Sequence, residues 1–262
     1  MAGFTSYFCI KMIISKEIPT DWSDLQDKVC KYLNQAGYHA ETAKTIELVR
    51  GKVEVDVFAT ADDEMLNQFI CECKYWDTPV PQEKIHAFRT VVQDSGSMLG
   101  IFISKAGYQK GAIEAAKCSN VILKDWKGFI DLIAHKWLKN RFRDLLKIGD
   151  PLSLYTDPLD VPVEKLSEEA KQKCMNLQVK YMPHYMLIRG MEMGMLRPED
   201  PVVLDGVRFD DFNSLFDHLE RVMTQGVKEF EELFANNPVE GWKFDCFDKM
   251  RFESHITEYL TE

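Results

Sequence analysis

The sequence predicts an α/β protein, with a central mixed β-sheet flanked by helices and a mostly helical C-terminal module. Two observations carry this prediction for the first half of the chain. Segments in which apolar and polar residues alternate at period 2, as in strands, stand beside segments with apolar residues at helical spacing. The continuously apolar run from Leu99 to Ile103 is typical of a strand that is buried on both faces.

The elements expected in the first half alternate between helices and strands. The group Trp22-Ser23-Asp24 is expected to cap the first helix, Gly37 to end it, and the prolines at 79 and 81 to stop the strand before the second helix. In chain order we expect an N-terminal arm (1–20), a helix (24–35), a strand, a hairpin (53–76), a helix (82–94), a strand (100–104), a helix (111–118), a strand (121–126) and a helix (127–147).

The chain is large enough to bury a core, in one large domain or two small ones, because it has 262 residues of which 45% are hydrophobic. No run approaches the roughly 18 apolar residues of a membrane span. The start of the chain is interrupted by Lys11 and has no small-residue cleavage site, so no signal peptide is expected. The seven cysteines lack metal-binding spacing, which favours reduced thiols and a cytoplasmic location.

Charge is distributed unevenly along the chain. Residues 1–150 hold 20 Lys+Arg and 20 Asp+Glu, whereas residues 151–262 hold 12 Lys+Arg and 22 Asp+Glu and so carry the whole net charge of −10. This total argues against a protein that coats nucleic acid. The neutral first half can approach a phosphate backbone, and the acidic second half would be repelled by it.

The hairpin expected at 53–76 carries the candidate site. Its strands read V-E-V-D-V-F-A and F-I-C-E-C-K-Y-W, with an acidic turn at 62–64 between them. Alternation puts Glu54 and Asp56 on one face of the first strand, and Glu72 and Lys74 on one face of the second. If these faces coincide, Asp56, Glu72 and Lys74 converge on an otherwise apolar sheet, which is costly unless they pair or hold a metal.

The spacing of Glu72 and Lys74 is weak by itself, because an acidic residue two positions before a lysine is expected roughly 4 times by chance in such a composition. The chain has three such triplets, beginning at Glu72, Asp125 and Glu169, and only the first lies in an apolar strand. A cross-strand salt bridge on a solvated hairpin face would explain the same residues.

The order of elements favours a functional site over a simple salt bridge. Four stretches of sequence stand with it: V-D-V (55–57), E-C-K (72–74), G-I-F-I-S-K-A-G-Y (100–108) and the A-I-E-A-A helix leading to V-I-L-K-D-W. In these stretches and in the order of its elements, the chain resembles the Mrr-like restriction endonuclease domain of the PD-(D/E)xK nuclease superfamily over about residues 22–135. The resemblance implies a restriction-endonuclease-like fold and a metal-dependent endonuclease of restriction or defence type that hydrolyses DNA phosphodiester bonds.

The same resemblance implies the roles of the hairpin residues. Asp56, Glu72 and Lys74 stand in the catalytic motif positions, and Mg²⁺, or Mn²⁺ in its place, would be held by Asp56, Glu72 and the backbone carbonyl of Cys73. The chain departs from the family at the first helix, where members often carry an early glutamate and this sequence reads Leu25-Gln26-Asp27.

Basic residues outside the hairpin are candidate nucleic-acid contacts. Lys105 follows the buried strand at its carboxyl end, where open α/β sheets tend to place their sites. The helix at 127–147 carries a basic patch that includes Lys136, Lys139, Arg141 and Arg143. A loop lysine and a solvated helix face are the simpler interpretations of these residues.

The chain is predicted to divide into a nuclease-like domain (1–148, including the arm), a proline-rich linker (149–163) and an acidic, mostly helical module (164–262). In this module we expect a helix from Glu164 to Lys180, a hairpin with an Asp-Gly turn after Pro201, and a helix from Asp211 to Phe234. The Met-rich segment from 185 to 196 is interpreted as adaptable core or interface.

Partners follow from the proposed chemistry. DNA is the expected substrate, a homodimer would bring two active centres to two strands, and the acidic module could bind a protein partner. The alternative from another class is a catalytically inactive nuclease-fold protein that acts as a nucleic-acid-binding or protein-binding scaffold. A third interpretation is an α/β protein whose hairpin charges form only a salt bridge.

Overall fold

The computed structural model describes residues 13–49, 51–61, 68–157, 161–193 and 201–240. These residues form two compact units, 13–143 and 144–240, and the division falls inside a long helix, α4 (Trp126–Tyr155). The predicted boundary after residue 148 lies further along this helix. The predicted arm is described only from Ile13 onward, and the predicted hairpin turn at 62–64 lies outside the described residues.

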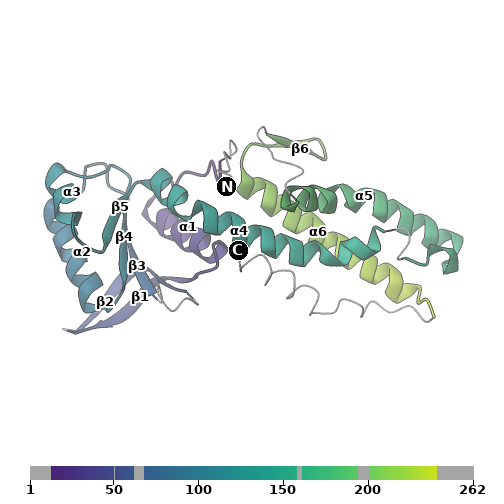
Figure 1. Cartoon of the computed structure of the whole chain (residues 1–262), viewed down its shortest axis with the longest axis horizontal. Helices are drawn as coiled ribbons and strands as arrows, with labels where there is room; N and C mark the ends of the chain where they lie inside the picture. The colour runs from purple at the N-terminus through teal and green to yellow at the C-terminus, as the bar shows by residue number, and fades with distance from the viewer. Residues whose placement is uncertain (1–12, 50, 62–67, 158–160, 194–200, 241–262) are drawn as a thin grey trace, which may run out of the picture. The chain divides into compact units, whose positions relative to one another are not determined.

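The unit 13–143 contains a five-stranded mixed sheet with the strand order β1-β2-β3-β4-β5 (Figure 1). β1 (His39–Leu48), β2 (Gly51–Thr60) and β3 (Gln68–Lys74) are antiparallel neighbours, whereas β3, β4 (Leu99–Ser104) and β5 (Val121–Lys124) are parallel. Parallel neighbours need crossovers, which α2 (Gln82–Asp94) and α3 (Lys110–Ala116) provide. The predicted mixed sheet flanked by helices is confirmed.

Helices cover both faces of this sheet (Figure 1). On one face, Ile70 of β3 and Phe102 of β4 share a buried cluster with Phe88 of α2 and residues of α3. The other face carries α1 (Trp22–Gln35) and the first part of α4, joined where the Trp137 indole N–H donates to the Gln35 side chain at 2.9 Å. β4 is buried along nearly its whole length, as its apolar run predicts.

The first helix, α1, begins at Trp22, two residues earlier than the predicted start at Asp24, and its N-cap is the residue before the predicted capping group. Asp21 is the N-cap, and its carboxylate accepts the backbone N–H of Asp24 at 2.9 Å. Asp24 instead accepts the backbone N–H of Thr20 at 2.7 Å. At the other end, Gly37 has the positive φ of 82° that is typical of the residue after a helix, as predicted.

The unit 144–240 is mostly helical. It contains the end of α4, a 3₁₀ turn η1 (Val163–Lys165), α5 (Glu168–Glu192), the hairpin β6 (Val202–Leu204) and β7 (Val207–Phe209), and α6 (Phe212–Asn236). The hairpin turns through Asp205 and Gly206, whose φ angles are 51° and 74°, so the predicted Asp-Gly turn is confirmed. None of the helices in the described part of the chain has the length and hydropathy of a membrane span.

The first part of the predicted linker is helical, because α4 continues through Gly149 and Pro151. A proline inside a helix costs about 3 kcal/mol, so other contacts must offset it. Tyr155, one turn beyond, stacks on Phe230 of α6 with a centroid separation of 4.8 Å. A Cβ on Gly149 would lie 2.9 Å from the sulfur of Met223, which shows how closely α4 and α6 approach there.

We predict that Gly100→Ala destabilises the unit 13–143 because α2 packs directly on this position. The added Cβ would lie 2.5 Å from a methyl of Val92 and 2.8 Å from the ring of Phe88, both on α2. Overpacking of this kind costs about 1–3 kcal/mol, measured by urea unfolding. Thr90→Ala on the exposed face of α2 is the control and should change stability by less than about 0.5 kcal/mol; equal effects of the two substitutions would contradict the close packing of α2 on β4.

Candidate functional site

The site lies where β2 and β3 stop pairing. Their register runs from Thr60 opposite Gln68 to Val57 opposite Cys71, and the paired residues go no further. On its other edge, β3 stays paired with β4 as far as Lys74 opposite Ser104. The residues of β3 after Cys71 are therefore held by β4, while their edge toward β2 is open to side chains.

The Asp56 side chain occupies this edge. Its Oδ2 accepts the backbone N–H of Cys73 at 2.7 Å, in place of the backbone acceptor that a continued ladder would supply. On the opposite side of β2, the pairing with β1 skips Asp56, because the pairs on either side are Thr42 with Val57 and Lys44 with Val55. The residue facing the gap, Ala43, has a φ of 50°, which is uncommon for a residue other than glycine. The backbone is thus irregular beside the acid.

Lys74 joins the two predicted acids. Its ammonium forms an ion pair with Oε1 of Glu72 and lies 3.8 Å from Oδ2 of Asp56. The side chains of Lys74, Glu72 and Asp56 are 18%, 25% and 17% exposed, so all three are partly withdrawn from water. The structure therefore brings the three residues together, as the alternation of the two strands predicts.

Burial and charge act on this cluster in opposite directions. Burial raises the pKa of Glu72, and the nearby Asp56 carboxylate raises it further, although Lys74 opposes both effects. Burial alone would lower the pKa of Lys74, but the carboxylates of Glu72 and Asp56 outweigh it and raise the pKa. Lys74 therefore stays protonated at neutral pH.

Cys73 can contribute only through its backbone. Its thiol is buried, and burial raises the thiol pKa well above its usual range. The N–H and C=O of one strand residue point to the same side, so the Cys73 carbonyl is directed to the same side as its N–H, toward Asp56. The Lys74 carbonyl points the opposite way and accepts the backbone N–H of Lys105 at 3.0 Å.

A second lysine, which the sequence analysis missed, lies near Glu72. Lys84, in the first turn of α2, lowers the pKa of Glu72 through its charge. The ammonium groups of Lys74 and Lys84 lie 5.9 Å and 6.0 Å from the ring centroid of Trp76. The position of Lys84, three residues after Pro81, could have indicated this. The helix that follows β3 starts near the end of the sheet at which β3 ends, so residues in its first turn lie close to Glu72 and Lys74.

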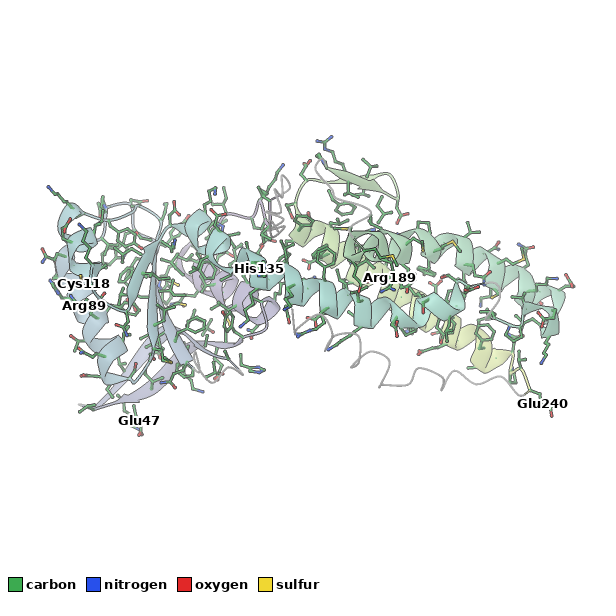
Figure 2. All side chains as sticks on the ribbon, viewed as in Figure 1. Glu47, Arg89, Cys118, His135, Arg189 and Glu240 are labelled. Carbon is green, nitrogen blue, oxygen red and sulfur yellow. The ribbon has the colours of Figure 1, made fainter. Side chains whose placement is uncertain are left out.

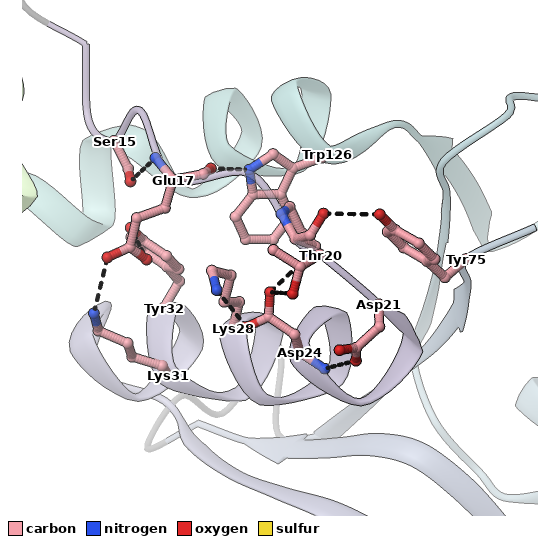
Figure 3. A network of polar contacts seen from close by, with 11 residues as sticks. Ser15, Glu17, Thr20, Asp21, Asp24, Lys28, Lys31, Tyr32, Tyr75 and Trp126 are labelled. Atoms are coloured by element: carbon pink, nitrogen blue, oxygen red, sulfur yellow. Dashed lines mark hydrogen bonds and ion pairs between the residues drawn. The ribbon is translucent and has the colours of Figure 1, made fainter.

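The end of β3 is held by the segment before α1 (Figure 3). The Tyr75 hydroxyl donates to the carbonyl of Pro19 at 3.1 Å, and the Trp126 indole N–H donates to the carbonyl of Glu17 at 2.7 Å. The Glu17 carboxylate also accepts from Tyr32 of α1 at 3.4 Å. These bonds fix the residue next to Lys74 against α1 and α4.

Lys105, a predicted DNA contact, lies beside the end of β3. Its ammonium is 2.7 Å from a carboxylate oxygen of Asp77 and 4.3 Å from the ring centroid of Tyr75. Both the pairing and the exposed position place this ammonium at the surface beside Tyr75, the residue after Lys74. Such an exposed ion pair is weak, so a phosphate could replace Asp77.

The predicted basic patch on α4 is only partly exposed. Lys136, Lys139 and Arg143 are exposed and follow helical spacing, and the ammonium of Lys136 lies 3.6 Å from the ring centroid of Tyr38. Arg141 is 5% exposed and so does not belong to this surface. Its position on the same helix was predicted correctly, but the face it occupies is buried.

Two further acidic positions remain apart from the cluster. Glu54 is exposed on β2, and Lys52 pairs with Glu47 of β1 at 3.0 Å rather than with Glu54; Glu47 points outward (Figure 2). At the position of the family's early glutamate, α1 has a buried Gln26 followed by an exposed Asp27. Neither Gln26 nor Asp27 is a buried acid in this part of α1.

The site thus combines an acid from one strand, an acid and a lysine from the next, and a parting of the two strands, within an α/β fold that is consistent with the restriction-endonuclease class. Residues 19–133 match the family model of the Mrr catalytic domain, described as a restriction endonuclease, and this part of the chain is therefore similar to restriction endonuclease domains of the Mrr type. Domains of this type generally use divalent metal ions.

The other comparisons add little. One solved structure, described as the crystal structure of a protein of unknown function, AF1548, is 17% identical in sequence. The match covers 65% of this chain and 100% of that chain, and its TM-score of 0.38 is low. No curated protein matches the chain.

We predict that Glu72→Gln stabilises the protein in EDTA. The substitution keeps the shape of the side chain and removes a partly buried negative charge beside Asp56. Burial and the Asp56 carboxylate raise the pKa of Glu72 in the folded protein, so a charged Glu72 makes folding less favourable at pH 7. The free energy of unfolding at pH 7, from urea titration, should rise on the order of 1 kcal/mol. Glu54→Gln on the exposed face of β2 is the control, and a loss of stability in Glu72→Gln would contradict the proposed electrostatic cost.

Proposed function

We propose that this protein is a metal-dependent endonuclease of restriction or defence type that hydrolyses DNA phosphodiester bonds. The observation that carries the proposal is the partly buried cluster of Asp56, Glu72 and Lys74 at the parting of β2 and β3, inside a domain that matches restriction endonucleases. The family match supports a nuclease function. The catalytic activity, the metal ion and the DNA substrate are what we propose.

The residues of the cluster fit a hard divalent cation. Two carboxylates and one ammonium leave one negative charge in a partly buried place, which a divalent ion would offset. Oxygen ligands would come from Asp56, Glu72 and the carbonyl of Cys73, which suits Mg²⁺, with Mn²⁺ as a substitute. When bound, such an ion supplies a more acidic water molecule and offsets charge on phosphate oxygens.

The chain's own groups would orient and stabilise the substrate. The Asp56–Cys73 hydrogen bond holds one carboxylate in place before any ligand arrives. Because its pKa is raised, Lys74 stays protonated and would offset the charge that develops on the phosphate, rather than accept a proton. Lys84, which shares the Trp76 ring with Lys74, and Lys105, beside Tyr75 at the end of β3, are proposed as further cations for the phosphate backbone.

The approach of DNA is assigned to the unit 13–143. The exposed Lys136, Lys139 and Arg143 of α4 are proposed as further contacts to the phosphate backbone, and the buried Arg141 is not. The second half of the chain carries the net charge of −10 and would repel DNA, so we propose that it binds a protein partner. Cleavage of both strands would need two centres, for which we propose a homodimer.

A cytoplasmic location is part of the proposal. The five cysteines among the described residues are free, and three of them, Cys71, Cys73 and Cys174, are buried. Reduced thiols are typical of proteins in reducing compartments.

We predict that Lys74→Ala abolishes cleavage of plasmid DNA. The purified protein should convert supercoiled plasmid to nicked or linear forms with Mg²⁺ and not with EDTA, followed on agarose gels. Removing the ammonium removes its stabilisation of phosphate charge, and the rate should fall at least about 100-fold. Lys52→Ala, on the same sheet and 67% exposed, is the matched control and should cut normally. Cleavage by Lys74→Ala at the wild-type rate would contradict the catalytic role assigned to Lys74.

We predict that the intact cluster binds one Mn²⁺ per chain in calorimetric titration, and that Asp56→Asn removes this binding because an amide is a poorer ligand than a carboxylate. Glu47→Gln on β1 serves as the control, since Glu47 is 82% exposed and pairs only with Lys52 among the described residues. This titration also tests the inactive scaffold alternative. Retained DNA binding without any metal binding would favour that scaffold over the endonuclease.

A further inference from the structure

A second cluster of ligand-type side chains lies in the unit 144–240, apart from the proposed nuclease site. It consists of His184 on α5, Asp205 in the turn between β6 and β7, and His218 on α6. One nitrogen or oxygen of each residue lies within 4.8 Å of those of the other two. Sequence spacing gave no signal, because the three residues come from three separate elements.

Both histidines direct Nε2 at the same carboxylate oxygen. Nε2 of His184 is 2.6 Å from Oδ2 of Asp205, and Nε2 of His218 is 3.5 Å from it. The two rings are 6.0 Å apart, and the His218 ring also packs on Phe209 at 4.9 Å. The arrangement is thus three polar groups converging on one point, with an aromatic side chain behind one of them.

Burial makes this arrangement expensive without a ligand. The side chain of His184 is 2% exposed and that of His218 is 14% exposed, whereas Asp205 is 51% exposed. Nε2 of His218 is buried and makes no well-formed hydrogen bond among the described residues, because its partner in the cluster, Oδ2 of Asp205, lies 3.5 Å away. A buried nitrogen that lacks a well-formed hydrogen bond is unfavourable. A simple clamp between His184 and Asp205 leaves the orientation of His218 unexplained.

The dimensions of the cluster suit a tetrahedral metal ion. Two ligand atoms at about 2.0–2.1 Å from such an ion lie roughly 3.3 Å apart. The His218–Asp205 separation is already close to this value, and the His184–Asp205 separation would have to open from 2.6 Å. Because Asp205 sits in an exposed turn, the carboxylate can make this small movement without disturbing the buried helices.

We propose that His184, Asp205 and His218 form a binding site for a divalent transition metal ion, with Zn²⁺ as the best match. Two imidazole nitrogens and one carboxylate are a common zinc ligand set, and water from the exposed side of Asp205 can complete it. The ion would tie the β6–β7 hairpin to α5 and α6. Nitrogen ligands distinguish this site from the all-oxygen set of the nuclease cluster, so the inference does not rest on the proposed function.

The hairpin turn offers a variant that removes a ligand and preserves the fold. Asp205 and Gly206 both have positive φ, and Asn-Gly is at least as favourable in such a turn as Asp-Gly. Asp205→Asn therefore removes the anionic ligand and retains the turn. His218→Asn is the second variant, and His135→Asn, an exposed histidine on α4 (Figure 2), is the matched control.

The test titrates metal-free, full-length protein with Zn²⁺ in a calorimeter, with saturating Mg²⁺ in cell and syringe as a competitor for the oxygen ligands of the nuclease cluster. Wild type and His135→Asn should bind one Zn²⁺ per chain and gain thermal stability from it. In Asp205→Asn and His218→Asn the affinity for Zn²⁺ should fall at least about tenfold, and the gain in thermal stability should be smaller. Circular dichroism without metal establishes that the variants are folded.

Titration with Co²⁺ checks the chemistry of the ligands. A tetrahedral visible spectrum without a thiolate charge-transfer band is expected, because the ligands are nitrogen and oxygen. Absence of stoichiometric binding, binding that Asp205→Asn and His218→Asn leave unchanged, or a thiolate band would each overturn the proposal.

Discussion

The hydrogen bond from the Cys73 backbone to the Asp56 carboxylate is the interaction on which the candidate site depends. It stands where the β2–β3 ladder ends, and it gives a backbone donor the partner that a neighbouring strand would otherwise supply. One consequence is that a carboxylate is fixed at the open edge of β3. Another is that the Cys73 carbonyl points to that edge, next to Glu72 and Lys74.

Holding these charges together opposes stability. Glu72 and Asp56 repel each other in a place with little water, and Lys74 balances only part of their charge. The fold supports this arrangement from outside the cluster: β4 pairs with β3 from Phe69 to Lys74, and the segment before α1 holds Tyr75. A site that costs stability in the absence of its ligand is expected where binding or catalysis requires unfavourable proximity.

Much of the first unit could be predicted from local patterns. Period-2 alternation located β2 and β3 and identified Asp56, Glu72 and Lys74 as neighbours, because a strand fixes which side chains share a face. The same reasoning could not recognise Lys84, whose proximity to Glu72 depends on how α2 returns over the sheet. It also could not distinguish the buried Arg141 from its exposed neighbours, since a basic residue gives no sign of what packs on it.

Prediction was weaker in the second half, where tertiary contacts decide the outcome. Gly149 and Pro151 are ordinary signals for a linker, but the packing of Tyr155 on α6 keeps the chain helical past them. The cluster of His184, Asp205 and His218 depends on two helices and a turn meeting at one point. The two halves also differ in charge, since the first 150 residues are neutral and the remainder carries the net charge of −10.

The central claim is that the parting of β2 and β3 creates a cation site. Anomalous X-ray diffraction from crystals grown with Mn²⁺ tests it most directly, because the scattering locates the ion without any assumption about activity. The account predicts a manganese peak in contact with Asp56, Glu72 and the carbonyl of Cys73. A peak elsewhere, or density for the Lys74 ammonium alone between the carboxylates at saturating Mn²⁺, would contradict it.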